Sequence, residues 1–184
     1  MKKYILGIIV IISVILVSGC ISNSDNNDAD QPKTLTEGGI SIKYPGTWVP
    51  ANSKNNETIA AVADPDSIDS STGFGKVSVV IQKRTVNSSS NPSSIETLFS
   101  QNYKDLFSNS SYKLIAEGNV TVGKYENAFE CVYTIDENGT VKKHRAIWIE
   151  NNNDIYVILC TAPETEFDSH SKNFDFIINT FKIS

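Results

Sequence analysis

Histidine and cysteine side chains carry much of protein nucleophile, base and transition-metal chemistry, and this chain has few of them. It contains two histidines, His144 and His170, and three cysteines, Cys20, Cys131 and Cys160. A zinc site needs such residues clustered at short spacings, and neither histidine has that pattern. No Gly-x-Ser-x-Gly nucleophile turn occurs either. We therefore interpret both histidines as surface or structural residues and expect no catalytic residue, no metal site and no cofactor.

Three aspartates, Asp64, Asp66 and Asp69, lie at a spacing that superficially resembles a calcium loop. The segment lacks the glycine and the distal glutamate of an EF-hand. We therefore expect a solvated loop.

Cys20 closes a segment with the features of an export signal. Lys2 and Lys3 precede an apolar stretch, residues 4–17, which is too short for an ordinary membrane-spanning helix of roughly 20 residues. The letters VSGC, ending at Cys20, resemble the lipobox of secreted lipoproteins. That resemblance implies cleavage before Cys20 and acylation of its thiol. We predict a signal peptide at residues 1–19, with an ordinary cleaved signal or an uncleaved anchor as open alternatives.

Residues 20–34 are rich in Asn, Asp and Ser and nearly free of apolar side chains. Such a segment cannot bury enough surface to offset its chain entropy, so we predict a disordered linker behind the lipid anchor. Without Lys2 and Lys3 the chain has 14 basic and 21 acidic side chains, a formal charge of −7. This balance argues against nucleic acid as a partner, since phosphate binding rests on Lys and Arg.

The chain also contains sequons, Asn-x-Ser/Thr with a non-proline middle residue, which accept N-linked glycans on exported proteins. They begin at Asn56, Asn87, Asn109, Asn119 and Asn138.

Residues 35–184 form one predicted domain of strands and two helices. β-branched runs and alternating apolar residues, bounded by Pro, Gly and Asn turns, indicate the strands. The predicted strands are 39–44, 58–63, 74–84, 112–122, 126–135, 141–150 and 154–161.

The last three strands form the clearest local unit. Asn138-Gly139 is a strong hairpin signal, and a second tight turn is predicted at residues 152–153. Both faces of this meander are then apolar, so something must cover each face. The implied cross-strand pairs are Phe129 with Trp148, Cys131 with Ala146, Tyr133 with His144, Trp148 with Val157 and Ala146 with Leu159.

This register places Cys131 and Cys160 on opposite faces, with strand 141–150 between them. Their separation is then roughly 9 to 10 Å across the strands, beyond the roughly 7 Å Cα distance that a disulfide permits. We expect two unpaired, buried thiols.

Two segments are predicted helices. Residues 95–107 follow a capping box from Ser93 to Glu96, and a second helix starts near Pro163 and Thr165. Their apolar stripes are Ile95, Leu98, Phe99, Tyr103 and Leu106 in the first helix, and Phe167, Phe174, Ile177, Ile178 and Phe181 in the second. We predict an α+β fold, an antiparallel sheet flanked by helices as a three-layer α-β-α domain.

The order of these pieces resembles the PsbP-like family. The resemblance rests on YPGTW at residues 44–48, Asp64-Pro65, GKYENA at residues 123–128 and the closing NTFKI at residues 179–183. It is nearest to the PsbP-related lipoproteins of methanogenic archaea and covers residues 39–184. It implies a sheet flanked by helices. The best-known members of the family have a non-catalytic role as extrinsic subunits that bind and stabilise a membrane complex, but the resemblance carries only the fold over to this chain. Within YPGTW we interpret Trp48 as a core residue, with an exposed binding anchor as the alternative.

These observations favour a lipid-anchored extracytoplasmic protein that binds or supports another cell-surface protein. The alternative is a small-ligand-binding or transport-accessory lipoprotein, which would need a concave pocket lined by aromatic residues. A hydrolase would need a nucleophile, a base and an orienting partner assembled in space. We expect no enzyme activity and a monomeric domain.

Overall fold

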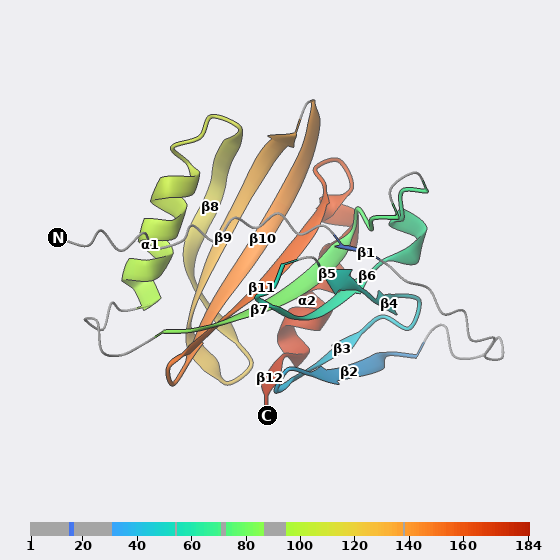
Figure 1. The fold of residues 1–184 in the computed structure, drawn as a ribbon, viewed down its shortest axis with the longest axis horizontal. Helices are drawn as coiled ribbons and strands as arrows, with labels where there is room; N and C mark the ends of the chain where they lie inside the picture. The colour runs from blue at the N-terminus through green and yellow to red at the C-terminus, as the bar shows by residue number, and fades with distance from the viewer. Residues whose placement is uncertain (1–14, 17–30, 54, 71–72, 87–94, 138) are drawn as a thin grey trace.

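The computed structural model describes residues 15–16, 31–53, 55–70, 73–86, 95–137 and 139–184 (Figure 1). Most of the predicted signal peptide and linker, with Cys20, Asn87, Asn138 and the capping residue Ser93, lies outside these ranges. Across the described residues, no helix has both the length and the apolar character needed to cross a membrane.

A seven-stranded antiparallel sheet dominates the molecule, in the order β4-β6-β7-β11-β10-β9-β8. Its strands are β4 (Val49–Pro50), β6 (Thr58–Ala63), β7 (Ser78–Thr85), β11 (Asp154–Pro163), β10 (Thr140–Asn151), β9 (Tyr125–Glu137) and β8 (Tyr112–Val122). Beside it lies a three-stranded sheet of β12 (Lys182–Ile183), β3 (Ile40–Tyr44) and β2 (Lys33–Glu37). A further strand pair is formed by β1 (Ile15–Leu16) and β5 (Asn52–Ser53).

The predicted hairpins are confirmed residue by residue. Phe129 pairs with Trp148 and Tyr133 with His144 between β9 and β10. Trp148 pairs with Val157 between β10 and β11. Gly139, the described half of the Asn-Gly turn, has a φ of 85°, the left-handed conformation that this turn requires.

Other predicted strand bounds needed correction. β7 begins at Ser78 rather than at residue 74, because residues 74–77 close a loop in which Ser67 Oγ accepts the Val77 N–H at 3.0 Å. β2 begins at Lys33, inside the predicted linker 20–34. Its hairpin with β3 turns at Gly38 and Gly39, which have φ values of 57° and 77°. At Gly38 an added Cβ would lie 2.6 Å from Ile59 Cβ, so glycine is needed there for both conformation and space.

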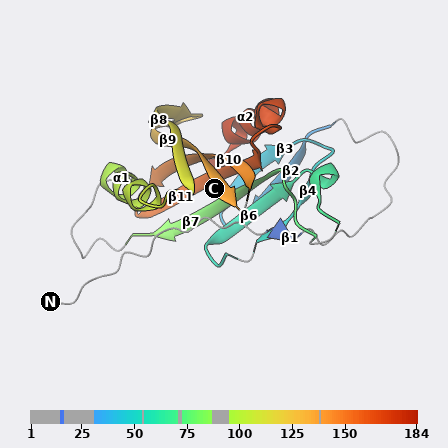
Figure 2. The ribbon, with the colours of Figure 1, turned by 90° about the horizontal axis from the view of Figure 1, so that it is seen from above.

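The larger core fills one face of the seven-stranded sheet. Helix α2 (Ser171–Thr180) packs there beside β3, and Trp48 meets Phe174 edge to face at 6.2 Å. Trp48 is 1% exposed, so it is a core residue, and the alternative of an exposed anchor is wrong. Figure 2 shows α2 on one side of the sheet and α1 (Ile95–Leu106) displaced toward the β8 end.

A second core lies between α1 and the opposite face of the sheet. Phe99 and Tyr103 of α1 contact Trp148 of β10, with ring centroids 5.8 and 5.9 Å apart. The Trp148 Nε1–H donates to the Tyr103 hydroxyl at 3.0 Å, so the buried indole keeps a hydrogen-bond partner. Both faces of the meander are therefore covered.

The predicted fold class is confirmed only in its coarser form. The described part of the chain is mostly antiparallel β with two short α-helices. The three-layer α-β-α arrangement is not confirmed, because a second sheet shares one face with α2 and α1 reaches only part of the other. The second helix also begins later than expected. Pro163 ends β11 opposite Lys142, and only the short 3-10 helix η2 (Phe167–His170) precedes α2. β7 pairs with β11 no further than Thr161, so the missing N–H of Pro163 leaves no gap in that ladder.

Replacing Trp148 with alanine should lower the free energy of unfolding by about 3 to 5 kcal/mol, because the change leaves a cavity between α1 and β10. Leu114→Ala is the matched control, since Leu114 is 40% exposed, and it should cost less than about 0.5 kcal/mol. Urea denaturation of both variants measures the difference. Equal costs would show that Trp148 is not a core residue.

Candidate functional site

The two histidines lie on opposite sides of the seven-stranded sheet. His144 of β10 is buried on the α1 side, where its ring stacks on Tyr133 at 5.0 Å and its Nδ1 lies 2.9 Å from Thr161 Oγ1. His170 ends η2 on the α2 side, and its Nδ1 lies 3.9 Å from Asp64 Oδ2. The structure therefore does not bring these two candidate bases together.

His144 is held in its neutral form. Burial, with a smaller contribution from the nearby charge of Lys142, lowers the pKa of His144 to about 3. Its polar partner is a threonine hydroxyl rather than a nucleophile beside an orienting acid. This arrangement fits a structural histidine.

The aspartate loop uses its carboxylates locally. Asp64 Oδ1 accepts the Asp66 N–H at 3.1 Å and so caps η1 (Pro65–Ser67). Asp69 forms an ion pair with Lys76 at 3.7 Å. Over the described part of the chain, no group of three or more His, Cys, Asp or Glu side chains is placed to hold a metal ion.

Cys131 and Cys160 belong to the two different cores, and both are fully buried and free. This confirms the predicted parity of β9 and β11. Burial raises the pKa of each thiol to about 12, so neither thiol is activated as a nucleophile.

One charged cluster escaped the sequence analysis. Arg145 of β10 donates through Nε to Glu130 of β9 at 2.6 Å and through a terminal nitrogen to Asp175 of α2 at 2.5 Å. The hairpin register places Glu130 diagonally across from Arg145 on the same face, whereas no local pattern marks Asp175 as its partner. The cluster clamps α2 onto the sheet, and its carboxylates are already occupied.

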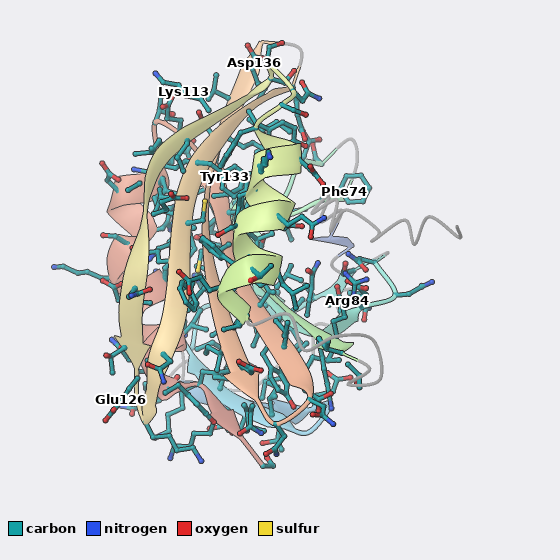
Figure 3. The ribbon with its side chains drawn as sticks, turned by 90° about the vertical axis from the view of Figure 1, so that its left-hand side faces the viewer. Phe74, Arg84, Lys113, Glu126, Tyr133 and Asp136 are labelled. Carbon is teal, nitrogen blue, oxygen red and sulfur yellow. The ribbon has the colours of Figure 1, made fainter. Side chains whose placement is uncertain are left out.

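The exposed edge of β8 is the most distinctive surface feature among the described residues. Residues 113–119 are all exposed, and the large apolar side chains of Leu114 and Ile115 are 40% and 49% exposed. Figure 3 looks onto this edge, with Tyr133 lying toward α1 and Lys113 projecting from the other face. In the sequence, the only signal of this feature is the adjacent pair Leu114 and Ile115 within a charged segment. The alternation of side chains along one strand does not show whether another element covers either of its faces.

Of the predicted glycosylation sites, Asn56, Asn109 and Asn119 are described, and all three are exposed. The other two sites and the lipidation site Cys20 lie outside the described residues.

A shallow, open depression lies along the outer face of α1, but it does not resemble an aromatic-lined ligand pocket. Its lining is Glu96, Thr97, Ser100, Gln101, Lys104 and Asp105. The nearby aromatic side chains, including Phe99 and Tyr103, face the core instead.

Comparison with known proteins gives this architecture a family. A family model described as PsbP-like protein matches residues 5–183, nearly the whole chain. The chain belongs to the PsbP-like family. No curated protein sequence matches this PsbP-like chain significantly. Its finer likeness to archaeal lipoproteins is not shown by these comparisons.

Solved structures support the PsbP-like fold at low sequence identity. The solution structure of cyanobacterial PsbP (CyanoP) from Synechocystis is similar with a TM-score of 0.62 at 11% identity, over 90% of this chain and 100% of that one. LpqN of Mycobacterium tuberculosis, described as involved in cell envelope biogenesis, gives 0.55 at 12% identity, over 84% and 91%. The Saccharomyces cerevisiae Ran-binding protein Mog1p gives 0.54 at 10% identity, over 84% and 96%. At such identities these likenesses show the fold alone.

Acid should destabilise the domain through His144. Its folded pKa of about 3 lies below its usual value of 6.5, so between these pH values the unfolded chain binds the extra proton and stability falls as pH falls. The full effect is roughly 4 to 5 kcal/mol. His144→Gln should flatten the pH dependence of the unfolding free energy across this interval, whereas His170→Gln should retain it. Parallel wild-type and His144→Gln curves would contradict the assignment.

Cys131 and Cys160 should remain unpaired. Alkylation of the purified full chain in denaturant without reductant should modify both residues, because they lie on opposite faces of the sheet. Peptide mapping checks this, and a peptide pair cross-linked between residues 131 and 160 would show that a hairpin register is wrong.

Proposed function

We propose that this PsbP-like protein is a lipid-anchored extracytoplasmic lipoprotein that acts as a non-enzymatic binding or accessory subunit of a cell-surface complex. The observation that carries the proposal is the direct succession of an apolar stretch, VSGC, a polar segment and a PsbP-like fold that starts at Lys33. A short apolar h-region ending in small residues is typical of export, and the polar segment behind it is suited to a tether.

Removal of residues 1–19 is compatible with the described fold. Within that range the described strand is β1, and its ladder contacts are two pairs with β5, at Asn52 and Ser53. The buried residues of the described cores all lie at Ile40 or beyond. A chain that begins at Cys20 therefore keeps the residues that hold it together.

The placement of the potentially reactive side chains supports a binding rather than a catalytic role. His144, Cys131 and Cys160 are buried in the two cores. Arg145 donates hydrogen bonds to carboxylates of β9 and α2. The likeness to lipoproteins of methanogenic archaea, drawn from the motifs, agrees with the anchor. The small-ligand alternative draws little support from the polar, open depression on α1.

The anchor is tested on the N-terminal peptide of the chain extracted from membranes. This peptide should begin at Cys20 and carry the mass of attached acyl chains. Cys20→Ser should lose that mass, and any variant chain cleaved near residue 20 should be soluble, because the polar segment has no apolar stretch.

Ser22→Ala alters the same segment without touching VSGC and should keep the lipid. An unmodified Cys20 in the wild-type peptide, in a chain that still sediments with membranes, would replace the lipoprotein proposal with an uncleaved anchor.

A further inference from the structure

The β8 strand forms a long open edge of the seven-stranded sheet. Such an edge presents unpaired backbone groups to other chains, and soluble proteins usually protect it. The opposite edge, β4, is two residues long, whereas β8 extends over 11 residues. The need for protection therefore falls on β8.

Leu114, one of the two large apolar side chains on this edge, lies on the α1 side. Leu114 pairs with Tyr133, which belongs to the α1 core. The register then shifts between Leu114 and Ala116, so Ile115 is the extra residue of a bulge. A bulge and the charged Lys113 blunt an edge, yet the two neighbouring side chains leave an apolar patch open to solvent.

A sequon lies on this same strand, at Asn119-Val120-Thr121. Asn119 pairs with Phe129, which packs against the α1 core, so Asn119 faces the same side as Leu114. A second register shift between Val120 and Val122 leaves Thr121 opposite two residues of β9, Glu126 and Asn127. Asn119 and Thr121 are both exposed, and Asn119 lies about 13 Å along the strand from Ile115.

The other two described sequons lie outside β8. In the sequon of Asn56 the hydroxyl of Thr58 is buried. In the sequon of Asn109 the side-chain Oδ1 already accepts the Ser111 N–H at 3.0 Å within the turn after α1. Among the described sequons, the one at Asn119 is thus the one that lies on the β8 edge, with Asn119 and Thr121 both exposed.

We propose that Asn119 carries an N-linked glycan that shields the β8 edge and keeps the protein from pairing edge to edge with other copies. The proposal rests on the extracytoplasmic location proposed above. A bulky, solvated glycan on the α1 side of β8 obstructs the approach of a second strand along the edge that carries Leu114 and Ile115. The glycan at this sequon therefore serves to block strand pairing.

The modification is a group transfer from a lipid-phosphate-linked oligosaccharide. A bond forms between Asn119 Nδ2 and the anomeric carbon of the sugar. The bond from that carbon to the phosphate oxygen breaks, the lipid phosphate leaves with the electron pair, and the amide nitrogen loses one proton to a base of the transferase.

The test uses the full chain purified from the membranes of its host in detergent. Glycopeptide mass spectrometry should find Asn119 occupied in the wild type and in Thr121→Ser, which keeps the sequon. Asn119→Gln and Thr121→Ala each destroy the sequon and should lose this glycan. In sedimentation their protein mass should rise by about twofold or more, because the uncovered edges pair.

Adding Leu114→Lys to Asn119→Gln should restore the single copy without restoring the glycan. Asn109→Gln, the matched control at another exposed sequon, should leave the sedimenting mass of the protein part unchanged. An exported, lipid-bearing chain with a bare Asn119 would overturn this inference and leave the anchored function intact. Loss of the Asn119 glycan without self-association would overturn the shielding role.

Discussion

The whole structure depends on a sheet whose central strands are apolar on both faces. β11 is buried from Ile155 through Ala162, eight consecutive residues. Alternating side chains of such a strand enter two different cores, so each face needs its own cover. One cover combines α2 with the three-stranded sheet, and the other is built largely by α1. The position of nearly every other element follows from this requirement.

The same constraint explains why the potentially reactive side chains of the meander are buried and neutral. The meander is folded tightly enough that its cysteines, its histidine and most of its aromatic side chains point into one core or the other. Burial there favours neutral thiols and a neutral imidazole over reactive forms. Among the described residues, the large apolar side chains that remain exposed are Leu114 and Ile115 of β8.

Local rules were enough to predict the meander. The Asn138-Gly139 turn and the tight turn at residues 152–153 set the registers of the two hairpins, and those registers placed Cys131 and Cys160 on opposite faces. The strand bounds that were predicted wrongly depend on residues that are distant in sequence. Lys33 joins a strand only because Tyr44 of β3 lies beside it, and Pro163 can end a strand only because β7 stops short of it. The solvent exposure of β8 likewise depends on whether another element packs against it, which the residue pattern of a single strand does not encode.

The junction between β7 and β11 has a consequence for how the chain folds. It is the seam that joins the β4-β6-β7 half of the large sheet to the β8–β11 meander, with α1 and three strands of chain between the two partners. Closing a loop of that length costs entropy before its contacts form, so the local hairpins gain their order first. β7 is made early during synthesis and pairs with β6, but its other side has no partner until β11, the last long strand, arrives. During folding, the apolar residues Val79 and Ile81 of β7 stay unpaired on that side until β11 supplies their partners, Cys160 and Ile158. The chain is most prone to misassembly in that interval.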